Sequence, residues 1–177
     1  MSSSVADCAG ATVAVTRDRR AVVYMGEDAR FEYIYKFVSR DRIAPGGAKP
    51  NATLLDHGTL YVARFDADGT GRWLPLVHGQ GPLTAAQGFA DQGEVVIKTR
   101  QASDRLGGTP MDRPEWLAID PQRREVYCTL TNNAGRGSPG KPGPIAKGSH
   151  AAACFIHKVF QIIQGSAPGL EPVQQDT

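Results

Sequence analysis

A guanidinium and two carboxylates lie close together in residues 109–116, which read TPMDRPEW. If this segment is extended, Arg113 and Glu115 point to one face and Trp116 to the other, because strand side chains alternate. Pro114 lacks a backbone donor, so it suits a loop or the first residue of a strand. A carboxylate and an arginine that share one face at the mouth of a strand could bind a metal ion and an oxyanion side by side.

The same spacing also fits a purely structural role. In that interpretation, Arg113 and Glu115 form a surface ion pair beside a core Trp116. Surface ion pairs of this kind are common and contribute little to stability. The spacing alone leaves both interpretations open.

The composition bounds the class of protein. The 177 residues make one domain, and a hydrophobic content of 41% allows a modest core. The 20 glycines and 12 prolines favour many turns over long helices. A net charge of +2 points to no nucleic-acid or membrane partner, and no apolar run is long enough to span a membrane.

The cysteines and the first residues carry no processing signal. Cys8, Cys128 and Cys154 are odd in number and form no CxxC motif, so no dense disulfide framework is expected. We interpret Cys128 as a core residue. The first eight residues have neither a basic nor an apolar region, so no export signal is visible.

Two β-hairpins are predicted in the first half of the chain. Residues 11–16 and 21–25 are rich in β-branched and small apolar residues and flank a short polar break. Residues 31–38 alternate strictly and place four aromatic side chains on one face of a strand. After a loop, residues 58–65 and 72–76 form the second hairpin.

One short helix is predicted near residues 91–106. Asp91 and Glu94 have the spacing of a capping box, and glycines 107 and 108 end the pattern. Apolar or small residues recur at helical spacing after the cap, at Val95, Thr99, Ala102 and Leu106. This helix leads the chain into residues 109–116.

A third hairpin, over residues 115–119 and 125–131, repeats the first at a fixed offset. Asp28, just beyond the first hairpin, then corresponds to Asn132. Repeated hairpins with polar groups at equivalent strand ends indicate a β-propeller. The prediction is therefore a mostly β fold, a partial β-propeller of about three blades with one short helix.

The end of the chain has a different character. Residues 134–148 are dominated by Gly, Pro, Ser and Lys, residues 149–163 fit a short amphipathic helix, and residues 165–177 are expected to be disordered. The predicted boundaries are an N-terminal segment over 1–8, a partial propeller over 9–135 and a largely disordered tail over 136–177.

Several motifs within residues 9–135 together resemble the PhoX-type alkaline phosphatases and keep the order of that family. They are residues 22–28, 31–38, 58–63, 83–90, 109–116 and 127–133. The resemblance implies a large β-propeller exported by the twin-arginine route to the periplasm or the medium. It also implies a phosphatase site built on a mixed iron and calcium cluster.

The resemblance assigns roles to three residues. Asp28 and Glu115 would be metal ligands, and Arg113 would hold the phosphate of a phosphate monoester substrate. Hard carboxylate oxygens suit calcium and ferric iron, and a guanidinium offers a planar fork to phosphate. Metal ions and an arginine can together stabilise charge on a phosphoryl group in transfer.

The chain also departs from the family pattern. A His-Glu pair that precedes the first strand in the family is replaced here by Cys8 and Ala9, so one carboxylate ligand is missing. The cysteine iron ligand of the family lies upstream, and that role is not transferred to Cys8. After Asn133 the resemblance ends. The chain therefore looks like an internal fragment of a PhoX-type propeller.

Three functions follow as hypotheses. The first is a PhoX-like metal-dependent phosphomonoesterase that is weakly active or inactive alone, because ligands from other blades are missing. The second is a non-catalytic propeller remnant or partner-binding module, with open sheet edges that invite self-association. The third is a calcium-dependent propeller hydrolase such as a lactonase. No Gly-x-Ser-x-Gly motif supports a serine hydrolase.

Overall fold

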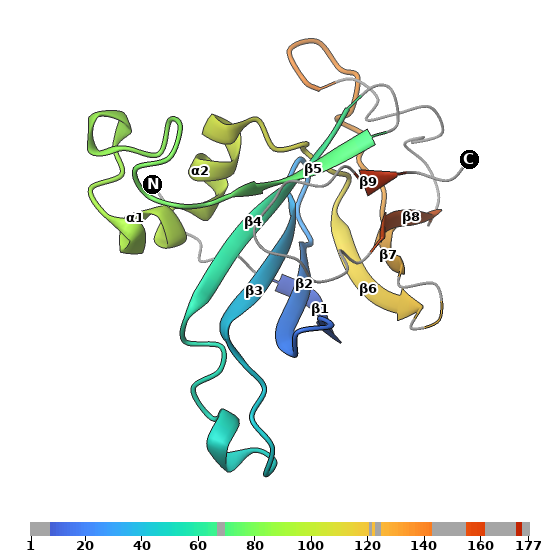
Figure 1. Cartoon of the computed structure of the whole chain (residues 1–177). Coiled ribbons are helices and arrows are strands. Elements are labelled where there is room, and N and C mark those ends of the chain that lie inside the picture. Colours follow the sequence, from blue (N-terminus) through green and yellow to red (C-terminus); the bar gives the residue numbers. More distant parts are fainter. Residues whose placement is uncertain are drawn as a thin grey trace.

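Strands dominate the part of the chain that the structure describes. This computed structural model describes residues 8–66, 70–120, 122, 125–142, 155–161 and 173–174. Their strands form one antiparallel sheet in the order β1-β2-β3-β4-β5-β9 and a second in the order β6-β7-β8 (Figure 1). Neither sheet closes on itself. The prediction of a mostly β fold is confirmed.

The first predicted hairpin is formed by β1 (Cys8–Val15) and β2 (Arg20–Glu27). Its turn is held by the side chain of Thr16, which accepts a hydrogen bond from the backbone N–H of Arg20 at 2.8 Å. Arg19 takes a positive φ of 68°, which lets the chain reverse between the strands.

The strand predicted over residues 31–38 is instead β3 (Ile34–Arg42). The prediction was wrong at Phe31, whose φ of 67° takes it out of the extended region. The N–H of Phe31 donates to the carbonyl of Met111, a distant segment that the local pattern does not contain. Of the four aromatic residues expected on one face, Tyr33 and Tyr35 are buried in the same hydrophobic core, whereas Phe31 lies outside the strand.

The second hairpin consists of β4 (Gly58–Phe65) and β5 (Thr70–Pro75), as predicted. Residues 67–69 of its turn lie outside the described residues. The connection from β3 to β4 contains a 3₁₀ turn, η1 (Lys49–Asn51), and extends away from the sheets at the lower end of Figure 1. The side-chain amide of Asn51 closes this connection through hydrogen bonds to the backbone of Ala44.

Two helices replace the single predicted one. A 3₁₀ turn, η2 (Ala85–Gln87), precedes α1 (Gln92–Ile97), and α2 (Thr99–Leu106) follows. The cap is as predicted: Asp91 accepts from the N–H of Glu94 at 2.8 Å, and Glu94 accepts from Ala90. The break falls at Lys98, whose φ of −96° and ψ of 35° leave the helical region.

The second sheet begins with the third predicted hairpin, β6 (Pro114–Asp120) and β7 (Glu125–Leu130). Its third strand, β8 (Phe155–Gln161), lies where the sequence predicted an amphipathic helix. That prediction was wrong, because β8 pairs along β7 and its backbone groups are used in the ladder. A two-residue strand, β9 (Val173–Gln174), pairs with β5, and both strands fall within the segment predicted to be a largely disordered tail.

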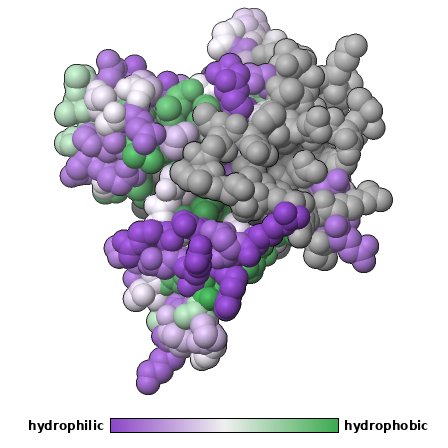
Figure 2. Space-filling model, viewed as in Figure 1, coloured by the Kyte–Doolittle hydropathy of each residue, from purple (hydrophilic) through white to green (hydrophobic). Residues whose placement is uncertain are grey.

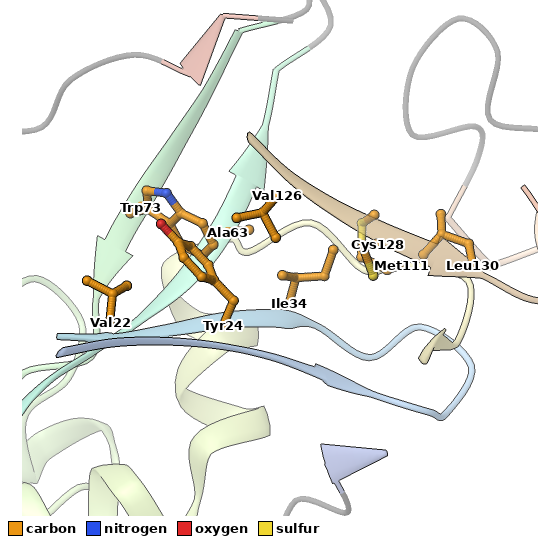
Figure 3. Close-up of a cluster of buried hydrophobic side chains, with 9 residues drawn as sticks. All are labelled: Val22, Tyr24, Ile34, Ala63, Trp73, Met111, Val126, Cys128 and Leu130. Atoms are coloured by element: carbon orange, nitrogen blue, oxygen red, sulfur yellow. The ribbon is translucent and has the colours of Figure 1, made fainter. Parts of the chain in front are cut away.

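Two cores lie on opposite faces of the first sheet. The inter-sheet core fills the space between the two sheets and consists of Val22, Tyr24, Ile34, Ala63, Trp73, Met111, Val126, Cys128 and Leu130 (Figure 3). The helix-side core joins the other face to α1, α2 and the segment before them, and consists of Tyr33, Tyr35, Val62, Leu76, Leu83, Phe89, Val95 and Ala102. The first sheet is therefore covered on both faces over β3 and β4.

The surface shows no broad apolar region in the view of Figure 2, where hydrophilic residues cover most of the described atoms. In the described part of the chain, no helix has the length and apolar character needed to cross a membrane.

Lys36 is a buried charge-bearing residue next to the inter-sheet core. It is 5% exposed, and its Nζ lies 4.9 Å from the ring centroid of Tyr61 and 4.7 Å from that of Trp73. Burial lowers the pKa of Lys36 to about 7. The two ring faces favour the charged form of the amine, while its removal from water opposes that form.

Candidate active site

Three segments meet where the two sheets join. They are residues 28–32 after β2, residues 110–113 before β6, and residues 131–136 after β7. Met111 donates its N–H to Glu32 O at 2.7 Å and accepts from the N–H of Phe31 at 2.9 Å. This backbone ladder brings the end of the first hairpin against the segment that the sequence singled out.

Asp28 and Arg113 form the centre of this junction. Arg113 Nε lies 3.0 Å from Asp28 Oδ1, and Arg113 Nη2 donates a hydrogen bond to Asp28 Oδ2 at 3.2 Å. The side chains are partly exposed, by 38% for Arg113 and 24% for Asp28, so solvent reaches the pair. Within the described part of the chain, Nη1 of Arg113 takes part in no hydrogen bond or ion pair.

The segment is not uniformly extended, contrary to the premise of the sequence analysis. Arg113 has a φ of 52°, a left-handed conformation that is rare for a residue with a side chain. Strand β6 begins one residue later at Pro114, which suits a first strand position. The turn at Arg113 aims its side chain at Asp28 rather than along the strand.

Glu115 lies in an irregularity of the β6–β7 ladder. Pro114 pairs with Leu130 and Leu117 with Cys128, so two residues of β6 face only Thr129 on β7. Such a bulge changes the direction of the side chains in it. Glu115 is half-buried and forms no ion pair with Arg113 among the described residues. Trp116 is 64% exposed, so its placement in the core was wrong.

Two glycines bring the start of β6 close to the first hairpin. Gly10 and Gly26 are partners in the β1–β2 ladder. A Cβ at Gly10 would lie 2.5 Å from the carbonyl oxygen of Glu115, and one at Gly26 would lie 2.7 Å from that of Pro114. The β6 backbone can approach the first hairpin this closely only because positions 10 and 26 carry no side chain.

A buried ion pair stands directly behind Arg113, and the sequence analysis missed it. Asp112 and Arg136 are almost fully enclosed, with side chains 5% and 4% exposed, and Arg136 Nε lies 2.5 Å from Asp112 Oδ1. Asn133 also donates to this oxygen at 2.8 Å. Arg136 lies in a stretch of Gly, Pro and Ser without periodicity, so no local signal identified its partner.

A second cluster of charged groups links the helices to the end of β2. Arg100 of α2 forms ion pairs with Glu27 and Glu32, the latter at 3.2 Å. Burial, together with the negative charge of Asp104, raises the pKa of Glu32 to about 7. The hydroxyl of Tyr33 donates to Asp104, and burial raises the pKa of this tyrosine. Glu27, the residue before Asp28, is therefore held against α2 by Arg100.

Comparison with known proteins assigns the family. The family model described as "Alkaline phosphatase PhoX" matches residues 9–166. The chain belongs to the PhoX alkaline phosphatase family. The matched range runs past Asn133, where the resemblance read from the motifs ended.

A solved structure of Pseudomonas fluorescens PhoX, in complex with vanadate as a transition-state analogue, is similar to this PhoX-family chain. The two are 56% identical in sequence, with a TM-score of 0.72 over 76% of this chain. The match covers 25% of the Pseudomonas chain, so the present chain spans a quarter of its length. A comparison with curated proteins gave no match. The two stacked sheets are part of a β-propeller, and the sequence had predicted about three blades.

The structure joins two of the three residues that the PhoX resemblance assigned. Asp28 and Arg113 are in contact, whereas Glu115 is tied to neither by an ion pair in the described part of the chain. Their roles as metal ligands and phosphate-binding group remain predictions. Among the described residues, no three His, Cys, Asp or Glu side chains come together as a group that could hold a metal ion. Asp28 and Glu115 therefore do not complete a metal site by themselves.

Proposed function

We propose that this chain carries the phosphate-binding part of a PhoX-type phosphomonoesterase site, with Arg113 as the group that holds the phosphate. One observation carries the proposal: Asp28 occupies the Nε–Nη2 side of the guanidinium and leaves Nη1 without a described partner. Membership of the PhoX family supports a phosphate monoester as the ligand.

Arg113 and Asp28 divide the work between them. An arginine has five N–H donors in a rigid fork, so it can contact a carboxylate on one side and phosphate oxygens on the other. Asp28 orients the guanidinium before the ligand arrives, which lowers the ordering cost of binding. The positive charge of Arg113 then stabilises negative charge on the phosphoryl oxygens.

Calcium and iron belong to the same proposal. Asp28 and Glu115 offer the oxygen donors that these ions prefer. These two side chains do not complete a metal site among the described residues, so they do not by themselves provide metal-dependent hydrolysis. We therefore expect weak or no phosphatase activity from the chain alone.

The test measures p-nitrophenyl phosphate hydrolysis by the purified chain, refolded with iron and calcium, with metal content assayed on the same sample. Turnover that Glu115→Gln abolishes, with both metals bound, would show a working site and would contradict the expected weakness of the chain. Binding of inorganic phosphate that Arg113→Ala removes, without turnover, is the expected result. A chain that binds no phosphate would refute the proposed role of Arg113.

A non-catalytic module that associates with itself is the second candidate. Strand β1 is hydrogen-bonded only to β2 among the described strands, and Val13 and Val15 on it are 63% and 55% exposed. An uncharged edge strand of this kind favours pairing with another chain. Sedimentation of the chain at several concentrations tests self-association. A chain that remains monomeric at every concentration would exclude this function. Association that the variant Val13→Lys disrupts would support it.

A further inference from the structure

Arg136 lies in one of the three segments that meet at the junction, and its side chain contacts the other two. Arg136 Nε contacts Asp112 Oδ1, and Arg136 Nη2 donates to the carbonyl of Pro110 at 2.6 Å. Its guanidinium carbon lies 5.4 Å from the ring centroid of Phe31, which follows Asp28 by three residues. Arg136 therefore contacts residues close in sequence to both members of the Arg113–Asp28 pair.

Asp112 is fixed from several directions. Its carboxylate accepts from Arg136 and Asn133, and its carbonyl accepts from the N–H of Thr131 at 2.9 Å. It also forms a β-bridge with Arg30. Asp112 directly precedes Arg113 in the chain. These bonds therefore fix the position of the backbone that leads into Arg113.

The backbone of the site needs such an anchor. Arg113 and Phe31 both have left-handed φ values, of 52° and 67°. Residues with side chains occupy this region only at a cost, and the surrounding structure must hold them there. Arg136 contacts Phe31 itself and two of the three residues before Arg113, Pro110 and Asp112.

We propose that Arg136 is a positioning residue for the phosphate site, which, through Asp112, Pro110 and Phe31, holds Arg113 in the left-handed conformation that faces Asp28. This inference rests on the proposed function for its importance to phosphate binding. Its structural part, the Arg113–Asp28 contact, can be measured without any ligand.

The variants must separate positioning from stability. Arg136→Met alone leaves the buried carboxylate of Asp112 without its cation, which strongly destabilises a protein. The double variant Asp112→Asn, Arg136→Met removes both charges, and Arg136→Lys keeps the charge but loses the planar fork. Lys141→Met is the matched control, because the Lys141 Nζ also lies over the Phe31 ring, at 5.8 Å, with no described bond to Asp112.

The first readout is the side-chain Nε–H resonance of Arg113 in ¹⁵N-labelled protein, assigned with Arg113→Lys. We expect this signal to shift toward that of a free arginine in Arg136→Lys and in the double variant. We expect it to stay unchanged in Lys141→Met. Unchanged thermal unfolding of the double variant would show that the loss is local.

The second readout is the affinity for inorganic phosphate. We expect it to fall by about tenfold in Arg136→Lys and in the double variant, as for the loss of one charged hydrogen bond. A folded variant of either kind that keeps the wild-type Arg113 signal would overturn the inference. If the wild-type chain binds no phosphate, the proposed function fails, whereas the Nε–H measurement still tests the role of Arg136.

Discussion

The side chains of Arg113 and Asp28 are in contact although 85 positions separate them in the chain. Asp28 follows the last residue of β2, and Arg113 precedes the first residue of β6. The contact therefore exists only when the second sheet is stacked on the first. This makes the pair a sensitive report of both the proposed site and the junction of the sheets.

Replacing Arg113 by alanine should lower the affinity for inorganic phosphate by at least about tenfold, because a charged donor to the ligand is lost. Asp28→Asn should have a smaller effect, since the guanidinium remains but loses its orienting carboxylate. Isothermal titration calorimetry measures both. Arg105→Ala, an exposed arginine at the end of α2, is the control. Equal affinities for Arg113→Ala and Arg105→Ala would contradict the assignment.

Gly26→Ala should destabilise the junction. The added Cβ would lie 2.7 Å from the carbonyl oxygen of Pro114, so β6 must move away from the first hairpin. Overpacking of this kind lowers the free energy of unfolding by about 1–3 kcal/mol. Urea unfolding of the variant measures this loss. Ala11→Ser, on the exposed face of β1, is the control and should change little. A stability equal to that of the control would mean that the glycine is not needed for the approach of β6.

The hairpins could be predicted because their signals are local. Alternating apolar residues and polar turns around residues 11–25 and 115–131 specify antiparallel strands without reference to the rest of the chain. The cap at Asp91 is local in the same way, and its hydrogen bond to Glu94 was found as predicted.

The site depends on contacts that no local pattern contains. Phe31 was expected in a strand, but its N–H donates to the carbonyl of Met111. The faces of Arg113 and Glu115 were inferred on the condition that residues 109–116 are extended, but Arg113 turns toward Asp28. Both misassignments come from pairings between segments far apart in sequence. The buried partner of Asp112, Arg136, was missed for the same reason.

Lys36→Met should flatten the pH dependence of stability above neutral pH. The folded-state pKa is about 7, below the ordinary value of 10.5, so between these values the unfolded chain binds a proton that the folded chain lacks. Stability of the wild type therefore rises with pH across this window, by up to about 1.4 kcal/mol per unit. Urea unfolding at a series of pH values measures this slope. Lys98→Met, a surface lysine paired with Glu94, should keep the slope; a slope that also persists in Lys36→Met would refute the assignment.

Cys128 should resist thiol reagents in the folded chain. It is fully buried in the inter-sheet core, and burial raises the pKa of its thiol to about 12, so almost no thiolate is present at neutral pH. With Cys8 and Cys154 replaced by serine, reaction with a chromogenic disulfide should be slow in buffer and fast in denaturant. Leu130→Ala, which opens the same core, should speed the reaction. Rapid labelling of the folded chain would show that the sheets separate readily.

The inter-sheet core has a consequence for the synthesis of the chain. Strands β1 to β5 leave the ribosome well before Val126, Cys128 and Leu130, which cover their apolar face. At ordinary elongation rates, that face stays uncovered for several seconds. Over that interval the first sheet exposes apolar surface of the kind that chaperones recognise, until β6 and β7 cover it.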